Sequence, residues 1–178
     1  MLTLASSSPQ RRAILEQLGI EYRALAADVA EVLDGEPRAL VIENALLKAR
    51  AVAGEPVLGV DTAVVVDDRV LGKPRDEAQA REFLAALSGR SHQVWSGIAI
   101  VERGGERTAA AVTEVRFMAL QAADVERYVA TGEWRGRAGG YAIQGRGAAL
   151  VERIEGDYLN VVGLPVAELV RVAPELLR

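Results

Sequence analysis

The sequence predicts one α/β domain over residues 1–178, built on a mixed, twisted sheet with flanking helices. Apolar segments of strand length alternate with segments in which apolar residues recur at helical spacing. Two long strand-like segments joined by "RGGE" indicate an antiparallel pair, beside strands that helices connect. At 178 residues, half of them hydrophobic, the chain is long enough for one substantial core.

The first elements are a strand followed by two helices. An apolar strand is expected over residues 2–5, and the spacing of apolar residues predicts a helix over 9–18 that Gly19 ends. The same spacing predicts a second helix over 37–53, with Gly54 as its C-cap.

The middle of the chain reads as a strand pair and a helix. Segment 57–74 contains two apolar runs around a tight, solvated turn at Asp67 and Asp68. A helix is expected over 76–87, because Asp76 is a good N-cap and the apolar residues after it share one face.

The last elements complete the alternation. Long strands are expected over 92–102 and 108–120, and a helix over 123–130. After a glycine-rich stretch, a strand over 148–154 and a closing helix over 164–172 are expected.

Composition excludes several classes of protein and site. The net charge of −4 leaves no basic stripe for duplex nucleic acid, and no apolar run approaches the roughly 20 residues that span a bilayer. The absence of cysteine excludes disulfides and thiolate metal sites, and His92 is the single histidine. A metal would therefore be a hard ion, Mg²⁺ or Mn²⁺, on carboxylate oxygens. Although Arg11–Arg12 could suggest a twin-arginine signal, an amphipathic helix pattern follows, so we expect a cytoplasmic protein.

A serine-rich turn joins the first strand to the first helix. A helix N-terminus presents unpaired N–H groups, Ser6 and Ser8 add hydroxyls, and Arg11 adds a fork that matches phosphate. The turn is therefore a candidate anion site, although no P-loop motif occurs in the chain. The alternative is that Ser8 simply caps the helix and the arginines are solvated.

Asp61 interrupts the apolar run over 57–66, and Thr62 follows it. A carboxylate within a buried strand is costly unless it is paired, bound to metal or exposed at a cleft. Asp61 is therefore a candidate general base or metal ligand, and the alternative is a structural carboxylate that accepts hydrogen bonds from a turn.

Two lysines could supply positive charge for a polyphosphate. Lys73 lies between glycine and proline in "LGKP", and Lys48 lies one helical turn after Asn44, where it could face inward. Each lysine taken alone is more often exposed to solvent.

The glycine-rich stretch "RGRAGGYAIQGRG" would allow backbone to pass close to a ligand. Tyr141 and Gln144 could recognise a planar base, because an amide both donates and accepts as a pyrimidine edge requires. The alternative is a structural glycine loop. His92 and the tryptophans Trp95 and Trp134 are expected to be structural.

Together these motifs resemble one family, the Maf-like nucleoside triphosphate pyrophosphatases. The resemblance covers nearly the whole chain, through "LASSSPQRRAILEQLG", "ENALLKARAV", "VLGVDTAVVVDDRVLGKP", "LSGRSHQVWSGIAIV", "GRAGGYAIQGRGAALVERIEGDY" and "NVVGLPV". It implies a mixed-sheet fold with a deep nucleotide cleft, as in inosine triphosphate pyrophosphatases, and a homodimer. It also implies metal-assisted hydrolysis of a nucleoside triphosphate to the monophosphate and pyrophosphate, and a link to arrest of septum formation.

The resemblance implies roles for individual residues. Asp61 matches the family's proton acceptor, and Lys73 and Glu31 complete the implied catalytic set, with Asp61 and Glu31 as ligands of Mg²⁺ or Mn²⁺. The implied substrate-binding residues are Ser6, Gln10, Arg11, Lys48, Thr62 and Gln144.

The base preference implied by the resemblance is dTTP and UTP. Thr62 and Gln144 match the dTTP/UTP branch rather than the 7-methyl-GTP branch, whereas Gln10 matches neither. The alternatives are a regulator of septum formation that binds nucleotide without hydrolysing it, a 7-methyl-GTP pyrophosphatase, and an inosine triphosphate pyrophosphatase. Asp61, Lys73 and Glu31 together favour an enzyme, because binding alone needs no base.

Overall fold

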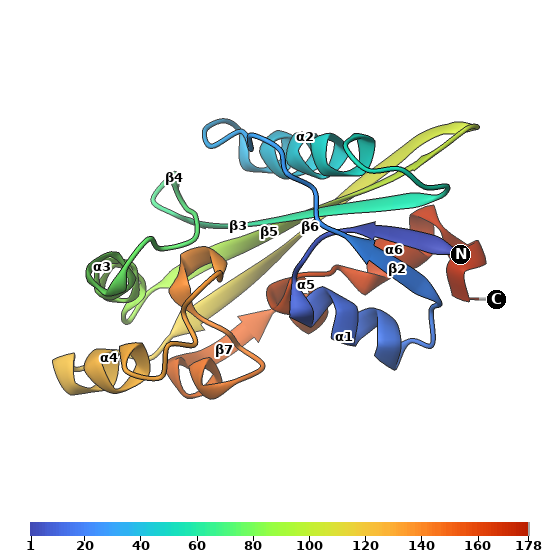
Figure 1. Ribbon diagram of the computed structural model, residues 1–178. Helices are drawn as coiled ribbons and strands as arrows, with labels where there is room; N and C mark the ends of the chain where they lie inside the picture. Colours follow the sequence, from blue (N-terminus) through green and yellow to red (C-terminus); the bar gives the residue numbers. More distant parts are fainter. Residues whose placement is uncertain (178) are drawn as a thin grey trace. The chain divides into compact units, whose positions relative to one another are not determined.

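The chain alternates strands and helices as the sequence predicts, and the computed structural model describes residues 1–177 (Figure 1). The strands are β1 (Leu2–Ala5), β2 (Tyr22–Leu25), β3 (Val57–Val66), β4 (Arg69–Leu71), β5 (Ser91–Glu102), β6 (Gly105–Phe117) and β7 (Val151–Glu155). The α-helices are α1 (Pro9–Gln17), α2 (Pro37–Arg50), α3 (Glu77–Leu87), α4 (Ala122–Val129), α5 (Tyr158–Val162) and α6 (Val166–Val172). Three short 3-10 helices are η1 (Ala138–Gly140), η2 (Arg146–Leu150) and η3 (Pro174–Leu177).

The strands form one seven-stranded sheet in the order β2-β1-β3-β5-β6-β7, with β4 paired to β3. β1 runs parallel to both β2 and β3, whereas β3 with β4 and β6 with β7 are antiparallel pairs. The expectation of a mixed sheet with flanking helices is therefore confirmed. None of the helices in residues 1–177 combines the length and the apolar character needed to cross a membrane.

The chain divides into two compact units, and β3, β5 and β6 contribute residues to both. The first unit comprises residues 1–62, 95–111 and 159–178, and the second comprises 63–94 and 112–158. The expectation of a single domain stays a prediction.

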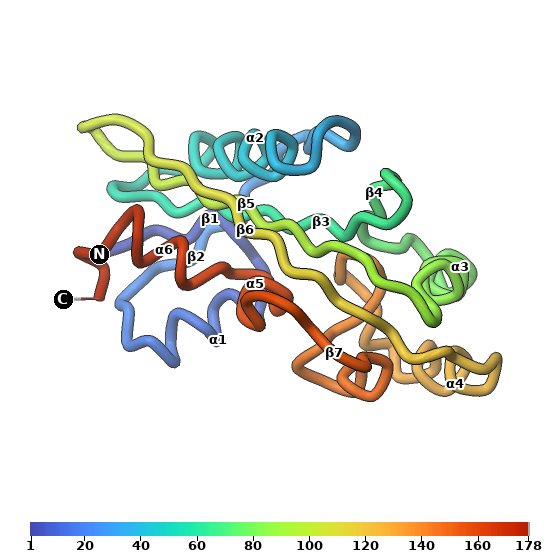
Figure 2. The backbone as a smooth tube through the Cα atoms, turned by 180° about the vertical axis from the view of Figure 1, so that it is seen from behind, coloured from blue at the N-terminus to red at the C-terminus, as the bar shows by residue number. Residues whose placement is uncertain are grey.

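In the first unit, α2 lies on one face of the strands, and α1, α5 and α6 lie on the other (Figures 1 and 2). The contact between α2 and the sheet is made by small side chains: Ala45 and Ala49 of α2 form a buried cluster with Ala5, Val57 and Ala99. Small residues at this contact let the helix backbone approach the strands closely.

The second unit has α3 packed against α4 and η1. Its core contains a ring cluster in which His92, Phe117 and Tyr141 meet edge to face, with ring centroids 4.8–5.5 Å apart. His92 is therefore structural, as expected, and its Nε2 lies 2.8 Å from the hydroxyl of Tyr141, a partner that the sequence does not indicate.

The structure differs from the expectations at several places. Two elements, β2 and α5, were not expected, because their four and five residues are too few to show a clear period. The strand expected from residue 148 begins at Val151, because η2 occupies the residues before it. Helix α2 ends at Arg50 rather than at residue 53.

Candidate active site

The carboxyl end of β1 is the centre of the candidate site. β1 pairs with β3 through Thr3–Val57 and Leu4–Leu58 and ends at Ala5, so that Asp61 and Thr62 of β3 lie beyond its end. The serine turn and the N-terminus of α1 follow β1 directly. The end of a parallel strand beside a helix N-terminus is where α/β proteins commonly bind anionic ligands.

Arg11 is on the first turns of α1, yet only 9% of its surface is exposed. Its guanidinium donates to three oxygens: Nε to the Gly163 carbonyl at 2.9 Å, Nη1 to Ser6 Oγ at 3.1 Å and Nη2 to Thr62 Oγ1 at 3.2 Å. Burial lowers the pKa of Arg11, while the negative charges of Asp61 and Glu31 raise it. Arg11 is thus a buried cation held in one orientation close to two acids.

The serines do not act as a simple helix cap. Ser8 stands at the N-cap position of α1, but its side chain makes no capping hydrogen bond; instead its backbone N–H donates to Ser6 Oγ at 3.2 Å. Ser8 Oγ and Gln10 Oε1 are buried without a hydrogen-bond partner within residues 1–177. The capping alternative for Ser8 is therefore wrong, and two polar atoms at this helix N-terminus have no protein partner in the part of the chain that the structure describes.

Lys48 joins the two acids of the site. Its Nζ lies 2.5 Å from Asp61 Oδ1 and 2.8 Å from Glu31 Oε1. Lys48 and Asp61 are both buried at 7% exposure, whereas the Glu31 side chain is about a third exposed. Lys48 does face inward, and Asp61 is a paired carboxylate within a buried strand.

Asn44 is a residue of the site that was not predicted from the sequence. Its Oδ1 accepts from the Val32 N–H at 2.7 Å, and its Nδ2 donates to the Val32 carbonyl at 2.9 Å and to Asp61 Oδ2 at 3.1 Å. One buried side chain therefore fixes both the loop of Glu31 and the orientation of Asp61. The available signal was its spacing from Lys48, since residues four apart lie on one helix face.

Two glycines bring α2 close enough for these contacts. A Cβ on Gly59 would lie 1.9 Å from the Ala45 carbonyl oxygen, and one on Gly97 would lie 2.3 Å from that of Val41. Both distances are far below van der Waals contact, so only glycine permits this approach. Gly59 also shares a strand face with Asp61, because side chains alternate along a strand.

Thr62 points to the opposite face from Asp61 and takes part in a second network. Its hydroxyl accepts from Arg11 and lies 2.9 Å from Ser96 Oγ, which donates to the Asn160 carbonyl at 3.3 Å. Since the Ser96 proton goes to Asn160, the Thr62 hydroxyl donates to Ser96. Ser96 and Asn160, both fully buried, were not predicted from the sequence.

A family model described as "Maf-like protein" matches residues 1–176. The chain belongs to this family. A dTTP/UTP pyrophosphatase of Anaeromyxobacter sp. (strain Fw109-5) is 51% identical over 184 residues, which cover 99% of this chain and 88% of the relative. A dTTP/UTP pyrophosphatase of Symbiobacterium thermophilum is 50% identical over 177 residues, covering 96% of this chain and 91% of the relative.

A solved structure, that of the Staphylococcus aureus Ham1 protein, has a similar fold. It matches with a TM-score of 0.50 and 16% identity, over 99% of this chain and 95% of that chain. At this identity the match concerns the fold alone, and it confirms the expected fold class for this Maf-like protein.

Within the first unit the Maf-like chain brings together most of the predicted site residues: Ser6, Arg11, Glu31, Lys48, Asp61 and Thr62. Gln10 lies close to this group. A Cβ built on Gly163 would be 3.8 Å from Gln10 Cγ and 3.8 Å from Thr62 Oγ1, so both side chains border the same glycine.

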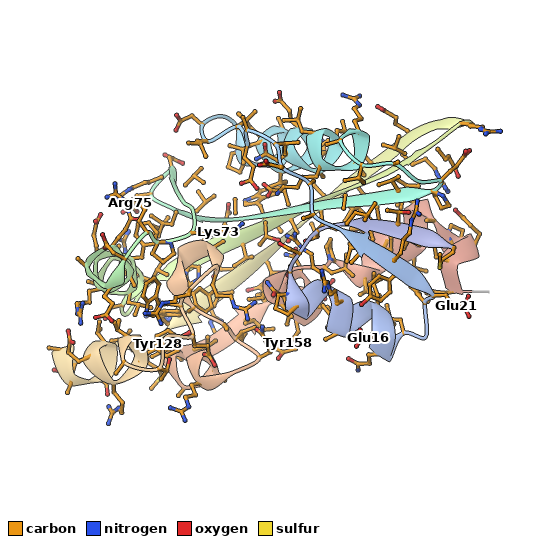
Figure 3. The ribbon with its side chains drawn as sticks, viewed as in Figure 1. Glu16, Glu21, Lys73, Arg75, Tyr128 and Tyr158 are labelled. Atoms are coloured by element: carbon orange, nitrogen blue, oxygen red, sulfur yellow. The ribbon has the colours of Figure 1, made fainter. Side chains whose placement is uncertain are left out.

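The other two predicted residues of the Maf-like chain, Lys73 and Gln144, belong to the second unit, and both are exposed. Lys73 lies on the segment between β4 and α3, with Arg75 two residues further on (Figure 3). Gln144 lies between η1 and η2.

The charged groups of the first-unit site nearly cancel one another. Arg11 and Lys48 are balanced by Asp61 and Glu31, so a triphosphate would need additional positive charge. No group of three or more acids or histidines that could hold a metal ion exists among residues 1–177. Two carboxylates remain, which is the number that Mg²⁺ commonly uses when phosphate oxygens and water complete its shell.

Proposed function

We propose that this Maf-like protein hydrolyses dTTP and UTP to the nucleoside monophosphate and pyrophosphate. The proposal is supported above all by the cluster at the end of β1, in which the buried Arg11, Lys48 and Asp61 lie with the partly exposed Glu31. It is supported also by two relatives, 51% and 50% identical in sequence, that carry the name dTTP/UTP pyrophosphatase.

Arg11, Ser6 and the N-terminus of α1 bind the phosphates in this proposal. A guanidinium offers a planar set of donors that matches phosphate oxygens, and the helix N-terminus adds unpaired N–H groups. Lys48 and the exposed Lys73 contribute further positive charge. Stabilising negative charge that spreads in the transition state is the main contribution that such groups make to phosphoryl transfer.

Asp61 is the general base. Its carboxylate takes a proton from water as the water oxygen bonds to the α-phosphorus, the bond from that phosphorus to the bridging oxygen breaks, and pyrophosphate leaves. Asn44 and Lys48 orient the carboxylate through Oδ2 and Oδ1. General-base assistance of this kind contributes a rate factor of about 10²–10⁴.

A divalent cation, Mg²⁺ or Mn²⁺, would be held by Asp61 and Glu31. The donor set fits, because hard oxygen ligands suit these ions and the site needs positive charge to accept a triphosphate. When bound, such an ion supplies Lewis-acid stabilisation of the phosphate oxygens.

Base recognition is assigned to Thr62, Gln10 and Gln144. Thr62 and Gln144 match the dTTP/UTP branch in sequence, and the unpartnered Gln10 Oε1 is an acceptor that a base N–H could use. A homodimer, a cytoplasmic location and a role in septum arrest remain predictions.

The test is pyrophosphate release by wild type and Asp61→Asn, with Mg²⁺ or Mn²⁺, from dTTP, UTP, 7-methyl-GTP and inosine triphosphate. We expect wild type to prefer dTTP and UTP, and Asp61→Asn to lose at least about 10²-fold in kcat with its fold intact. Asp68→Asn, an exposed change at the turn that follows the same strand, is the matched control and should retain activity.

Unchanged turnover in Asp61→Asn would overturn the mechanism. Nucleotide binding without turnover by wild type would instead support the regulator, and preference for another base would overturn the substrate assignment.

A further inference from the structure

The segment that carries Gln144 has little regular structure to hold it. It runs from Ala142, two residues after η1, to Gly147 in the first turn of η2, and a backbone hydrogen bond within it joins the Gly145 N–H to the Ala142 carbonyl at 3.1 Å. Contacts from outside the segment must therefore set the direction in which Gln144 points.

Glu133 supplies the contacts at one end of this segment. Its Oε1 accepts from the Arg146 N–H at 3.0 Å, and its Oε2 accepts from the Gly147 N–H at 3.0 Å. Two adjacent N–H groups thus bind the two oxygens of a single carboxylate, which fixes both their spacing and their direction.

Tyr128 of α4 supplies the contact at the other end. Its hydroxyl donates to Glu133 Oε2 at 3.0 Å and accepts from the Ala142 N–H at 3.0 Å. Tyr128 is 4% exposed and is labelled in Figure 3. The Ala142 end and the Arg146–Gly147 end are therefore tied together through one carboxylate and one hydroxyl, with the exposed Gln144 between them.

Sterics and charge support the same arrangement. A Cβ on Gly145 would lie 2.1 Å from Glu133 Oε1, so the segment passes the carboxylate at a distance that glycine permits. Burial raises the pKa of Glu133, but the hydrogen bonds from Arg146, Gly147 and Tyr128 outweigh it and the net pKa is lowered. The ionised form, which accepts all three hydrogen bonds, is thus the stable one.

We propose that Glu133 is a positioning residue that, through Tyr128 and the backbone of residues 142–147, holds Gln144 in the orientation that discriminates between bases. The proposal rests on the proposed function, in which Gln144 contacts the base. An amide distinguishes one base edge from another only if its donor and acceptor are fixed in place, since a freely rotating amide satisfies either edge.

The test compares kcat/KM for dTTP with kcat/KM for dATP in wild type, Glu133→Gln and Glu126→Gln. Glu133→Gln keeps the shape but turns one acceptor oxygen into a donor that faces an N–H. We expect the dTTP/dATP ratio to fall about tenfold or more, mainly through a higher KM for dTTP. Glu126→Gln is the matched control, because Glu126 is an exposed partner of Arg81 on the same helix as Tyr128 and the ratio should stay unchanged.

Two further variants separate positioning from a general structural role. In a Gln144→Ala background, Glu133→Gln should leave the ratio unchanged, because the residue through which it acts is gone. Tyr128→Phe removes the hydroxyl that joins the two ends, and should shift the ratio in the same direction even if Glu133→Gln fails to fold. Hydrogen exchange gives a readout apart from activity: the Arg146 and Gly147 amides should exchange faster in Glu133→Gln.

An equal loss of kcat/KM for both nucleotides, with the ratio unchanged in Glu133→Gln and Tyr128→Phe, would overturn the inference and leave the proposed function standing. A wild type that hydrolyses neither nucleotide would overturn both.

Discussion

Asn44 serves two parts of the site with one side chain. Its amide holds the Val32 backbone, and therefore the loop of Glu31, while its remaining N–H orients Asp61. An amide suits this place because it offers an acceptor and two donors without adding charge between Lys48 and the two acids. A carboxylate there would add a third negative charge to a buried cluster.

His92 contributes one identifiable part of the acid sensitivity of the fold. Burial lowers its pKa from 6.5 to about 4, so the folded protein holds the imidazole neutral over a range in which the unfolded chain protonates it. The unfolded state therefore binds more protons below pH 6.5, and stability falls as the pH drops from 6.5 towards 4, by about 3 kcal/mol in all.

We expect His92→Gln to remove that part of the pH dependence, because a neutral amide can keep a hydrogen bond to Tyr141. The measurement is the free energy of unfolding by denaturant at pH 7, 5.5 and 4.5 for wild type and variant. If the two slopes against pH are equal, the attribution to His92 is wrong.

At the scale of elements, the site depends on how closely α2 approaches β3 and β5. Asn44 and Lys48 reach Asp61 only because Gly59 and Gly97 have no side chains under the helix. Helix α2 therefore supplies two site residues, and the distance between α2 and the sheet is set by Gly59 of β3 and Gly97 of β5.

We expect Gly59→Ala to cost about 3 kcal/mol of stability and most of the activity, since the added methyl would strike the Ala45 carbonyl and push α2 outward. The matched control is Gly104→Ala at the tip of the β5–β6 hairpin, where a Cβ would meet nothing within 4 Å. Thermal unfolding and pyrophosphate release measure both effects. A stable, fully active Gly59→Ala would show that the close approach is not needed.

At the scale of the whole molecule, the net charge of the chain is −4, which has the same sign as the charge of a nucleoside triphosphate. Long-range attraction therefore does not favour binding, and local groups must supply it. Arg11 and Lys48 are already opposed by Asp61 and Glu31. This balance is the physical reason for expecting a divalent cation.

We expect a chelator to stop pyrophosphate release without lowering the melting temperature, because Lys48 already satisfies Asp61 and Glu31 when no metal is bound. Activity should return on addition of Mg²⁺ or Mn²⁺ in excess. Full activity in the chelator would exclude the metal-assisted mechanism. A large fall in melting temperature would instead indicate a structural metal.

The sequence predicted most of the elements because helix and strand periods are local. It indicated that Lys48 could face inward, without deciding it, and it predicted Asp61 as a carboxylate in a buried strand; the structure has both side chains buried. It missed Ser96, Asn160 and the partner of His92, since a hydroxyl, an amide or an imidazole acquires meaning only from a neighbour distant in the chain.

The sequence by itself determined the kinds of chemical group available and the local elements that carry them, because turns, caps and periodicity depend on adjacent residues. Only the tertiary structure decided that the guanidinium of Arg11 meets the Gly163 carbonyl, 152 positions away, and that Lys48 lies between two acids. Those contacts follow from the packing of helices on a sheet, and packing depends on the fit of surfaces that no local pattern records.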